Sequence, residues 1–326
     1  MPAPTAEELR STARVVSIPM RVRFRGVTHR EALMLRGPAG WGEFAPFPEY
    51  DDIESAAWLR AAVEAAWAGF PEPVRGRVPV NATVPAVAAS DVEPVLARFG
   101  TAPAVKIKVA ERGQTLDDDV ARVAEVRRLL PVARLRVDAN GGWDVPAALE
   151  ALEALAPYEL EYAEQPVMSI ADLRTVRLEL RRREISTLIA ADESVRKAED
   201  PLRVAHEDAA DLIVVKVAPL GGVRRALDIV AQAGLPAVVS SALDTSVGIS
   251  AGVALAASLP ELPYACGLGT LSLMEGDVSA TPLMPDGGWL PVRAPEVSEE
   301  LIERYAAPAE RSAWWLERLE RVVGLL

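Results

Sequence analysis

The sequence predicts an α/β fold: a modified TIM-type (β/α)7β barrel with an N-terminal α+β capping domain that the C-terminal segment completes. From about residue 100, short apolar runs alternate about seven times with helical patterns, which is typical of βα units around a parallel barrel sheet. No G-x-G-x-x-G motif follows the first of these strands, which disfavours a dinucleotide-binding sheet. We expect a capping domain at 1–95, the barrel at 96–275 and a return to the capping domain at 276–326.

The barrel elements follow from the spacing of the apolar residues. Strands are predicted at the apolar, β-branched runs 104–109, 133–139, 160–166, 188–194, 211–217, 236–242 and 264–269. Helices are predicted between them, at 116–130, 145–156, 170–183 and 222–234. The most apolar stretch, 247–260, is too short and too rich in Ser and Gly to span a bilayer, so we expect a buried helix there.

The first 95 residues have a different pattern. Residues 13–20 and 31–37 resemble antiparallel strands on either side of a polar tip at 21–30. A helix with an apolar stripe is expected at 54–69, and a terminal helix at 299–326. We expect that last helix to pack on the capping domain.

Composition limits the class of protein. The 326 residues carry a formal net charge of −12 with no basic cluster, so nucleic acid and anionic membrane are disfavoured as partners. The one cysteine, Cys266, excludes disulfides within the chain, and we expect it to be a small buried residue. The N-terminus lacks the apolar core of a secretory signal. We expect a cytoplasmic protein; the sequence gives no oligomeric state, and a monomer is compatible with it.

Lysine is scarce in this chain, and its positions are informative. Among 35 basic residues the lysines are Lys106, Lys108, Lys197 and Lys216. Three of them lie in apolar runs that are predicted strands, where a charged ammonium is costly unless paired. Because lysine can give up its proton in a protein and arginine cannot, these positions indicate a chemical requirement for lysine.

Acidic residues end three successive predicted strands. Asp138, Glu164 and Asp192 are separated by 26 and 28 residues, about one βα repeat each. Strand C-termini converge on one face of a barrel, so the three carboxylates are expected to meet there. An oxygen-rich site of this charge suits Mg²⁺ or Mn²⁺, whereas zinc is disfavoured because no His or Cys occurs at suitable spacing.

Lysines flank these acids at the same spacing. Lys106 and Lys108 project to one face of their strand, and each ammonium should disfavour the protonated form of the other. A nearby divalent cation would lower the lysine pKa further, toward a value useful for a base. Lys216, on a later strand, is expected to face them across the barrel mouth. The arrangement indicates proton abstraction next to a carboxylate.

The five motifs together resemble the enolase superfamily, and in particular its muconate-lactonising subgroup. They are K-I-K (106–108), R-V-D-A-N-G-G-W (136–143), E-Y-A-E-Q-P (161–166), A-A-D-E-S (190–194) and V-V-K-V-A-P-L-G-G (214–222). Segments 40–52 and 78–86 are similar to capping-domain segments of that superfamily. Within it, the short barrel and S-S-A-L-D-T-S-V-G-I (240–249) most resemble the o-succinylbenzoate synthase family of menaquinone biosynthesis, in its actinobacterial form.

That resemblance implies roles for the candidate residues. It makes Lys108 the base and Lys216 the opposing cation that stabilises an enediolate. It makes Lys106 a support for Lys108 near the substrate carboxylate. It assigns the binding of Mg²⁺ (or Mn²⁺) to Asp138, Glu164 and Asp192. It assigns contacts with the substrate to Asn140, Ser240 and Ser241. The polar tip around Arg25 and Gly26 would be a mobile lid.

The implied reaction is dehydration of 2-succinyl-6-hydroxy-2,4-cyclohexadiene-1-carboxylate to 2-succinylbenzoate, a carbon–oxygen lyase reaction. Lys108 would remove the proton α to the carboxylate and then protonate the departing hydroxyl on the same face. An N-acylamino acid racemase or dipeptide epimerase on the same scaffold stays open, because Lys108 and Lys216 also suit proton transfer on two faces. An epimerase would usually carry D-x-D on a late strand, where this chain has a single acid. A barrel that binds a small acid without turnover is the remaining alternative.

The other polar residues singled out by the sequence are two histidines and an arginine. His29 and His206 are expected at the surface, and no His lies on a later strand as a mandelate-racemase-like base would. Arg136 shares a strand face with Asp138. Two roles stay open for it: tuning of Lys108, or pairing with a barrel carboxylate.

Overall fold

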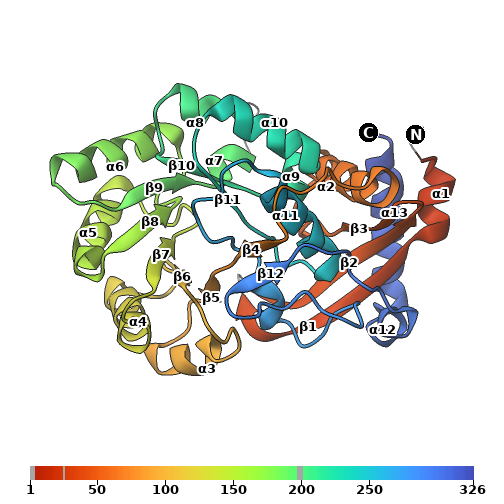
Figure 1. Ribbon diagram of the computed structural model, residues 1–326, viewed down its shortest axis with the longest axis horizontal. Helices are drawn as coiled ribbons and strands as arrows, with labels where there is room; N and C mark the ends of the chain where they lie inside the picture. Colours follow the sequence, from red (N-terminus) through yellow and green to blue (C-terminus); the bar gives the residue numbers. More distant parts are fainter. Residues whose placement is uncertain (1–3, 25, 197–200) are drawn as a thin grey trace.

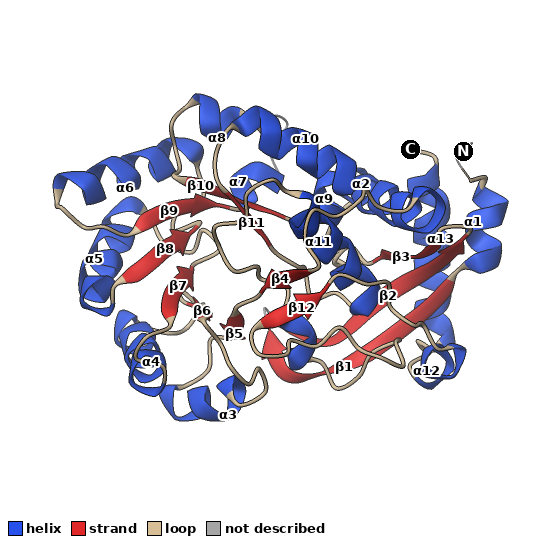
Figure 2. Cartoon of the chain, viewed as in Figure 1, coloured by secondary structure: helices blue, strands red, loops and turns tan. Residues whose placement is uncertain are grey.

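The computed structural model describes residues 4–24, 26–196 and 201–326. Strands β5 to β11 curve into a barrel-like parallel sheet with helices on its outside, and an antiparallel sheet with its own helices lies beside it (Figures 1 and 2). The predicted fold class is therefore confirmed. Within the described part of the chain, no helix is both long and apolar enough to cross a bilayer.

The parallel sheet follows the order of the sequence. Its strands are β5 (Ala82–Val84), β6 (Ala104–Lys108), β7 (Arg134–Asp138), β8 (Leu160–Glu164), β9 (Leu188–Ala191), β10 (Leu212–Val215) and β11 (Ala237–Val239). From β6 onward they match the predicted strands, each ending one to three residues earlier. Strand β5 lies within segment 78–86, which the resemblance had assigned to the capping domain, so that assignment is wrong for β5.

The segment 264–269 was predicted as a full strand but pairs only through isolated bridges. Gly267 bridges Ser240 in parallel, and Cys266 bridges Val80 in parallel. These bridges join the β11 edge to the β5 side and close the ring of strands. The two glycines of A-C-G-L-G shorten the pairing because glycine has no side chain to pack in a strand.

Helices follow the strands as βα units. They are α3 (Val92–Leu96), α4 (Leu116–Leu129), α5 (Val145–Leu155), α6 (Ile170–Arg182), α7 (Glu193–Arg196), α8 (Arg203–His206), α9 (Val217–Leu220), α10 (Val223–Ala233) and α11 (Ser246–Ser258). Side-chain caps fix several starts: the side chains of Thr115, Asp144 and Ser169 accept the N–H groups of Asp118, Ala147 and Asp172. The predicted helices are confirmed, and α11 is buried as expected.

Successive side chains along each barrel strand point alternately into the barrel interior and into the core between the sheet and the helices. Tyr162, Leu212 and Val214 belong to a small cluster inside the barrel, whereas Ala163, Ile213 and their equivalents pack in the main core. Arg136 is fully buried with its guanidinium 4.9 Å from the centre of the Tyr162 ring. Arg136 therefore belongs to the packed barrel interior.

Arg136 joins three parts of the barrel. Its Nε donates to Glu161 Oε2 at 2.6 Å, and its Nη1 donates to the Ala265 carbonyl at 2.6 Å and to Asn81 Oδ1 at 3.2 Å. Of the two roles left open by the sequence, pairing with a barrel carboxylate is the one that these contacts support. The side chain ties β7 to β8 and to the segment that closes the ring.

The capping domain contains an antiparallel sheet and helices from both ends of the chain. Its elements are α1 (Ala6–Thr12), β1 (Arg14–Phe24), β2 (Val27–Gly37), β3 (Gly40–Phe44), α2 (Asp52–Val63), a π-helix η1 (Glu64–Ala68), α12 (Glu299–Arg304) and α13 (Ala309–Val323). Strands β4 (Arg77–Pro79) and β12 (Trp289–Pro291) pair in a further small sheet. Three-residue 3-10 helices η2 (Ala89–Asp91) and η3 (Ala156–Tyr158), and η4 (Thr270–Leu273), complete the elements.

Three expectations for this domain need correction. The polar tip 21–30 is mostly strand, because β1 continues to Phe24 and β2 begins at Val27. The helix expected at 54–69 changes to π geometry from Glu64. The segment 299–326, expected to be one helix, forms two helices, α12 and α13. Pro308, the N-cap residue of α13, lacks the backbone N–H that a continuous helix needs there.

The C-terminal helix packs on the capping domain, as expected. Glu31 on β2 accepts hydrogen bonds from Arg311 Nε at 2.9 Å and from Trp315 Nε1 at 2.8 Å. The buried Arg318 donates to the carbonyls of Phe47 and Tyr50. An ion pair between Arg10 and Glu320 brings α1 beside α13, so the two ends of the chain lie close together (Figure 1). The exact divisions at residues 95 and 275 stay a prediction.

Candidate active site

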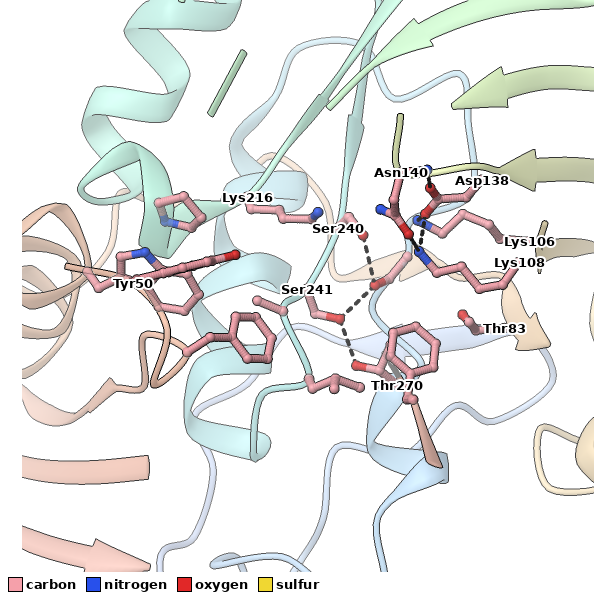
Figure 3. Close-up of a pocket in the computed structure, with 17 residues that line it drawn as sticks. Tyr50, Thr83, Lys106, Lys108, Asp138, Asn140, Lys216, Ser240, Ser241 and Thr270 are labelled. Carbon is pink, nitrogen blue, oxygen red and sulfur yellow. Dashed lines mark hydrogen bonds and ion pairs between the residues drawn. The ribbon is translucent and has the colours of Figure 1, made fainter. Parts of the chain in front are cut away.

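A cleft of about 550 Å³ lies where the carboxyl ends of the barrel strands face the capping domain (Figure 3). It brings together most of the predicted site residues: Lys106, Lys108, Asp138, Asn140, Lys216, Ser240 and Ser241. Glu164 and Asp192 contact the lysines of this group but do not line the cleft themselves. The parallel strands of the barrel account for the convergence, since these residues lie at or just beyond strand ends, apart from Lys106, which lies two residues before the end of β6.

Lys108 is held by two acceptors on the neighbouring strand. It is the register partner of Asp138, and its Nζ lies 2.5 Å from Asp138 Oδ2 and 2.6 Å from Asn140 Oδ1. Asn140 has a left-handed backbone (φ 47°), and its Nδ2 donates to Glu193 Oε1 at 3.2 Å. Because a carboxylate only accepts, that contact turns the amide oxygen of Asn140 toward Lys108.

Lys106 is held by a different set of acids. Its Nζ donates to both oxygens of Glu164, at 3.1 and 3.0 Å, and lies 3.4 Å from Asp138 Oδ2. Alternation along β6 skips Ile107 and places both lysines on the barrel side. The two ammonium groups thus share Asp138, which lies between them.

The electrostatic environments of the two lysines differ. Burial lowers the pKa of Lys108, and the positive charge of Lys106 adds to this effect against the opposing attraction of Asp138. The pKa of Lys106 is raised instead, because the attraction of Glu164 and Asp138 outweighs its burial. The expectation that each lysine disfavours the protonated form of the other thus agrees with Lys108, whereas for Lys106 the net shift is the opposite. Of the two ammonium groups, that of Lys108 is therefore the one that loses its proton more readily.

The carboxylates are also unequal. Burial raises the pKa of Asp138, but Lys108 and Lys106 more than offset it and hold that pKa well below its usual range. Burial raises the pKa of Glu164 to about 7, with a further contribution from the negative charge of Asp138. Asp192, directly after β9, is paired with Lys216, which directly follows β10.

The fit of the three acids to a divalent cation depends on their arrangement and on their chemistry. Among the described residues, no three acidic, His or Cys side chains form an ion-binding group as they stand, since lysine ammonium groups lie against each acid. The chemistry of the set nevertheless fits a hard cation: Asp138, Glu164 and Asp192 are buried oxygen donors from adjacent strands. The pKa of Glu164 is raised first by burial and then by the negative charge of Asp138, and a bound cation would offset both by favouring the ionised carboxylate.

Hydroxyl groups line the opposite wall of the cleft. Ser241 Oγ donates to the Gly267 carbonyl at 2.8 Å and lies 2.7 Å from Thr270 Oγ1. Since Ser241 has one hydroxyl proton, Thr270 is the donor of the second bond. The expected contacts Ser240 and Ser241 thus face Lys106 and Lys108 across the cleft (Figure 3).

The capping domain supplies an apolar wall that the sequence reasoning did not identify. Phe24, at the end of β1, lies with its ring centre 5.3 Å from Lys108 Nζ. Phe47, Tyr50 and Trp58 line the same cleft, and the aromatic segment 41–50 was the signal available for the first two. Of the predicted lid, Arg25 lies outside the described residues. Gly26 has φ 81°, as a tight turn there requires.

The residues expected to have no catalytic role are placed accordingly. His29 and His206 are exposed. Cys266 is fully buried, and burial raises the pKa of its thiol to about 12. A thiol with that pKa is a poor nucleophile at neutral pH, so these positions agree with the sequence predictions.

Comparison with known proteins gives matches over nearly the whole chain. Residues 15–66 match the family described as enolase N-terminal domain-like, and residues 88–296 match enolase C-terminal domain-like. The chain is 53% identical over 323 residues to the o-succinylbenzoate synthase of Thermobifida fusca, covering 96% of this chain and 99% of that protein. It is 54% identical over 317 residues to the protein of the same name from Mycolicibacterium smegmatis, covering 97% and 96%.

Solved structures share the fold at lower identity. The muconate lactonizing enzyme from Pseudomonas putida superposes with a TM-score of 0.73 at 21% identity, covering 90% of this chain and 98% of that one. The dipeptide epimerase from Enterococcus faecalis V583 gives 0.70 at 20% identity, covering 87% and 96%. These two likenesses concern the fold alone.

Proposed function

The chain belongs to the o-succinylbenzoate synthase family of the enolase superfamily, and we propose that Lys108 performs both proton transfers of the family's dehydration reaction. The substrate would be 2-succinyl-6-hydroxy-2,4-cyclohexadiene-1-carboxylate and the products 2-succinylbenzoate and water. The observation that carries the assignment is the position of Lys108: a buried amine with a lowered pKa, at the floor of a cleft that also contains cations and hydroxyl groups.

The neutral amine of Lys108 would start the reaction. Its lone pair takes the proton from the carbon that bears the substrate carboxylate, and the electron pair left behind is delocalised onto that carboxylate. Asp138 and Asn140 accept from Nζ, so they fix the direction of the amine while the reaction proceeds. Loss of this proton prepares the ring for aromatisation.

The same side chain would complete the elimination. The Lys108 ammonium donates its proton to the departing hydroxyl on the same face of the ring, which leaves as water, and the ring becomes aromatic. The lysine returns to its neutral form, so protons and electrons balance over the cycle. A lowered pKa suits both half-reactions, because it keeps the neutral amine accessible and makes the ammonium a stronger acid.

The cations around the cleft would stabilise the negative charge that develops. We assign Lys216 to the face opposite Lys108, and Lys106 to the support of Lys108 near the carboxylate. Asp138, Glu164 and Asp192 are proposed to hold Mg²⁺, or Mn²⁺. When bound, such an ion supplies positive charge to the substrate carboxylate. Asn140, Ser240 and Ser241 are proposed as substrate contacts, and the turn at Gly26 as part of a lid.

The cellular setting is proposed on the same basis. Membership of a family that serves menaquinone biosynthesis, together with a net charge of −12, supports a cytoplasmic enzyme acting on a free small carboxylate. Nucleic acid and membrane are not proposed as partners.

Racemisation of N-acylamino acids or epimerisation of dipeptides is the second candidate activity. It is favoured by one observation: Lys108 and Lys216 both line the cleft and come from strands on different sides of it (Figure 3). We propose dehydration as the main activity because the relatives above 50% identity carry the synthase name, whereas the epimerase likeness is one of fold at 20% identity.

A direct assay separates these candidates. The purified protein with Mg²⁺ is given the cyclohexadiene substrate, and formation of the aromatic product is followed by absorbance, with an arm containing EDTA. We expect turnover that EDTA abolishes and excess Mg²⁺ restores. No product here, alongside racemisation of N-succinyl amino acids, would reject the assignment.

A further inference from the structure

A second cavity, of about 500 Å³, lies directly behind Lys216. It is enclosed by α2 and η1 of the capping domain on one side and by α9 and α11 of the barrel on the other. Lys216 and Ser240 line both this cavity and the cleft. The only other charged residues among its described lining are Glu43 and Asp244. This cavity therefore connects two acids at the domain interface with the back of the site.

Glu43, on β3 of the capping domain, caps a barrel helix. Its Oε2 accepts from Thr245 N at 3.1 Å, from Thr245 Oγ1 at 2.5 Å and from Gly248 N at 2.9 Å. These donors are at the start of α11, whose N-cap residue is Thr245. The side chain is 8% exposed. One capping-domain carboxyl therefore fixes the first turn of a helix in the other domain.

The segment held in this way leads straight into the cleft. It runs from Ser240, after β11, to Thr245, and Ser240, Ser241 and Leu243 line the cleft. Leu243 has a left-handed backbone (φ 64°), which is strained for a leucine, and its carbonyl accepts from the buried Arg30 Nε at 2.9 Å. The segment therefore depends on contacts from the capping domain, Glu43 and Arg30, for its shape.

Glu43 is buried and Asp244, whose Oδ2 accepts from Ala242 N at 3.0 Å, is partly buried beside it. A Cβ added at Gly248 would be 3.0 Å from both Glu43 Oε2 and Asp244 Cγ, so the two carboxyl groups flank this glycine. The charged groups that face them are Arg30 from β2 and Lys216 from the end of β10. The Arg30 guanidinium nitrogens donate to the carbonyls of Leu243, Glu31 and Ala45, and Lys216 is paired with Asp192. Two full negative charges would be poorly compensated here.

The electrostatics agree with that geometry. Burial raises the pKa of Glu43 to about 8, and the charge of Asp244 adds to the shift. Burial also raises the pKa of Asp244. Two neighbouring carboxyl groups whose pKa values are both raised favour a state in which the pair keeps one proton.

We propose that Glu43 is a positioning residue, which holds the substrate-contacting segment 240–245 under the capping domain while it and Asp244 together keep one proton. The inference rests on the proposed function only for its kinetic measurements. Loss of that proton would place a second charge in the cavity and loosen the segment that carries Ser240 and Ser241. Substrate binding is then expected to weaken above about pH 8.

The chain offers a matched control for Glu43. Glu64, in η1, also reaches from the capping domain to the start of a barrel helix: its Oε1 accepts from Arg224 N at 3.2 Å and its Oε2 accepts from Val223 N. Gly222 has φ 129°, which strains any residue with a side chain, and a Cβ there would also be 2.2 Å from Glu64 Oε2, so both features favour the second glycine of the P-L-G-G motif. The first turn of α10 is not part of the described cleft lining. Glu64→Ala thus removes interdomain capping without touching the substrate segment.

The kinetic test compares wild type with Glu43→Ala, Glu43→Gln and Glu64→Ala from pH 6 to pH 9.5. We expect Glu43→Ala to raise KM by about 10-fold at pH 7 with a smaller change in kcat, and Glu64→Ala to lower the unfolding temperature with KM within about twofold. Glutamine mimics the protonated acid, so Glu43→Gln should raise KM less than alanine does and should abolish the wild-type rise of KM above pH 8.

Unchanged KM in Glu43→Ala, or a Glu43→Gln variant that keeps the alkaline rise, would overturn the inference. If the alanine variant does not fold, the glutamine variant decides alone. A wild type without turnover would reject the proposed function but not this pair. In that case the unfolding temperatures of wild type and Glu43→Gln are compared across the same pH range. The retained proton predicts that the unfolding temperature of wild type falls above pH 8 while that of Glu43→Gln does not. A wild-type unfolding temperature that does not fall above pH 8 would reject the retained proton.

Discussion

Lys108 Nζ and Asp138 Oδ2 lie 2.5 Å apart as side chains of register partners on neighbouring parallel strands. This contact places a titratable amine beside a carboxylate whose own pKa is held low. The pKa of Lys108 is nevertheless lowered, because burial and the neighbouring Lys106 outweigh the attraction of Asp138. The consequence is an amine that can alternate between base and acid while its position stays fixed.

The hydrogen bond from Lys108 to Asn140 gives a test of that environment. Asn140→Asp replaces a neutral acceptor with a carboxylate, which favours the charged lysine and raises its pKa. A higher pH is then needed to obtain the neutral base. We expect the rising limb of the pH profile of kcat/KM to move to higher pH in Asn140→Asp. An unmoved or acid-shifted limb would contradict the assignment of this limb to Lys108.

Arg136 gives a prediction about stability. Arg136→Met leaves Glu161 without its buried partner and removes the bond to the Ala265 carbonyl, so we expect a loss of about 3–5 kcal/mol in unfolding free energy, measured with urea. The control is Arg134→Met, because Arg134 lies 3.5 Å from the same glutamate but its side chain is 72% exposed. That change should cost less than about 1 kcal/mol. Equal losses would show that burial of the Arg136 pair is not the cause.

The raised pKa of Glu164 predicts how metal binding depends on pH. Glu164 binds its proton more tightly in the folded state than in the unfolded state. The protonated carboxyl group therefore stabilises the fold fully below pH 4.5, and this stabilisation is lost as the pH rises through about 7. A cation needs the ionised carboxylate, so the affinity for Mg²⁺ should fall as the pH drops below 7. The shift of the unfolding temperature with Mg²⁺ measures this at pH 6 and pH 8.

A carboxylate variant completes that experiment. Asp192→Asn keeps the size of the side chain and removes its charge, so the Mg²⁺-dependent stabilisation should be largely lost at both pH values. Glu179→Gln, which removes a half-buried acid of α6 that is not one of the three proposed ligands, should keep this stabilisation. A Mg²⁺ shift that is the same in all three proteins would place the ion elsewhere.

Cys266 should be inert in the folded protein. It is fully buried beside the ring-closing bridges, and the pKa of its thiol is raised to about 12. We expect no reaction with a thiol reagent such as DTNB at pH 8 in buffer, and one equivalent in urea. Rapid labelling of the native protein would mean that the closing segment opens.

The sequence predicted the barrel well because its strands are buried on both faces. Continuous apolar runs such as 211–217 and 104–109 are compatible with few structures other than a buried strand. The spacing of these strands placed Lys108, Asp138 and Lys216 at one end of the barrel. Segment 264–269 failed as a full strand because its glycines interrupt pairing, and β5 was missed because it is only three residues long.

The rest of the site could not be predicted from periodicity. Phe24 and Tyr50 reach the cleft only because the capping domain docks on the barrel, and the order of residues does not specify that contact. The opposite pKa shifts of Lys106 and Lys108 depend on which acids each one meets, a matter of a few ångströms. Glu43 was not singled out in the sequence, yet its carboxyl group caps the first turn of α11.

The central claim is that Lys108 moves the protons, and the turnover of Lys108→Ala with the cyclohexadiene substrate tests it most directly. The variant is first shown to unfold at a temperature close to that of wild type and to keep its Mg²⁺-dependent shift. We predict that kcat then falls by at least about 10³-fold, since the variant has neither the base nor the acid. A folded, metal-binding Lys108→Ala variant that retains a tenth or more of the wild-type kcat would contradict the account.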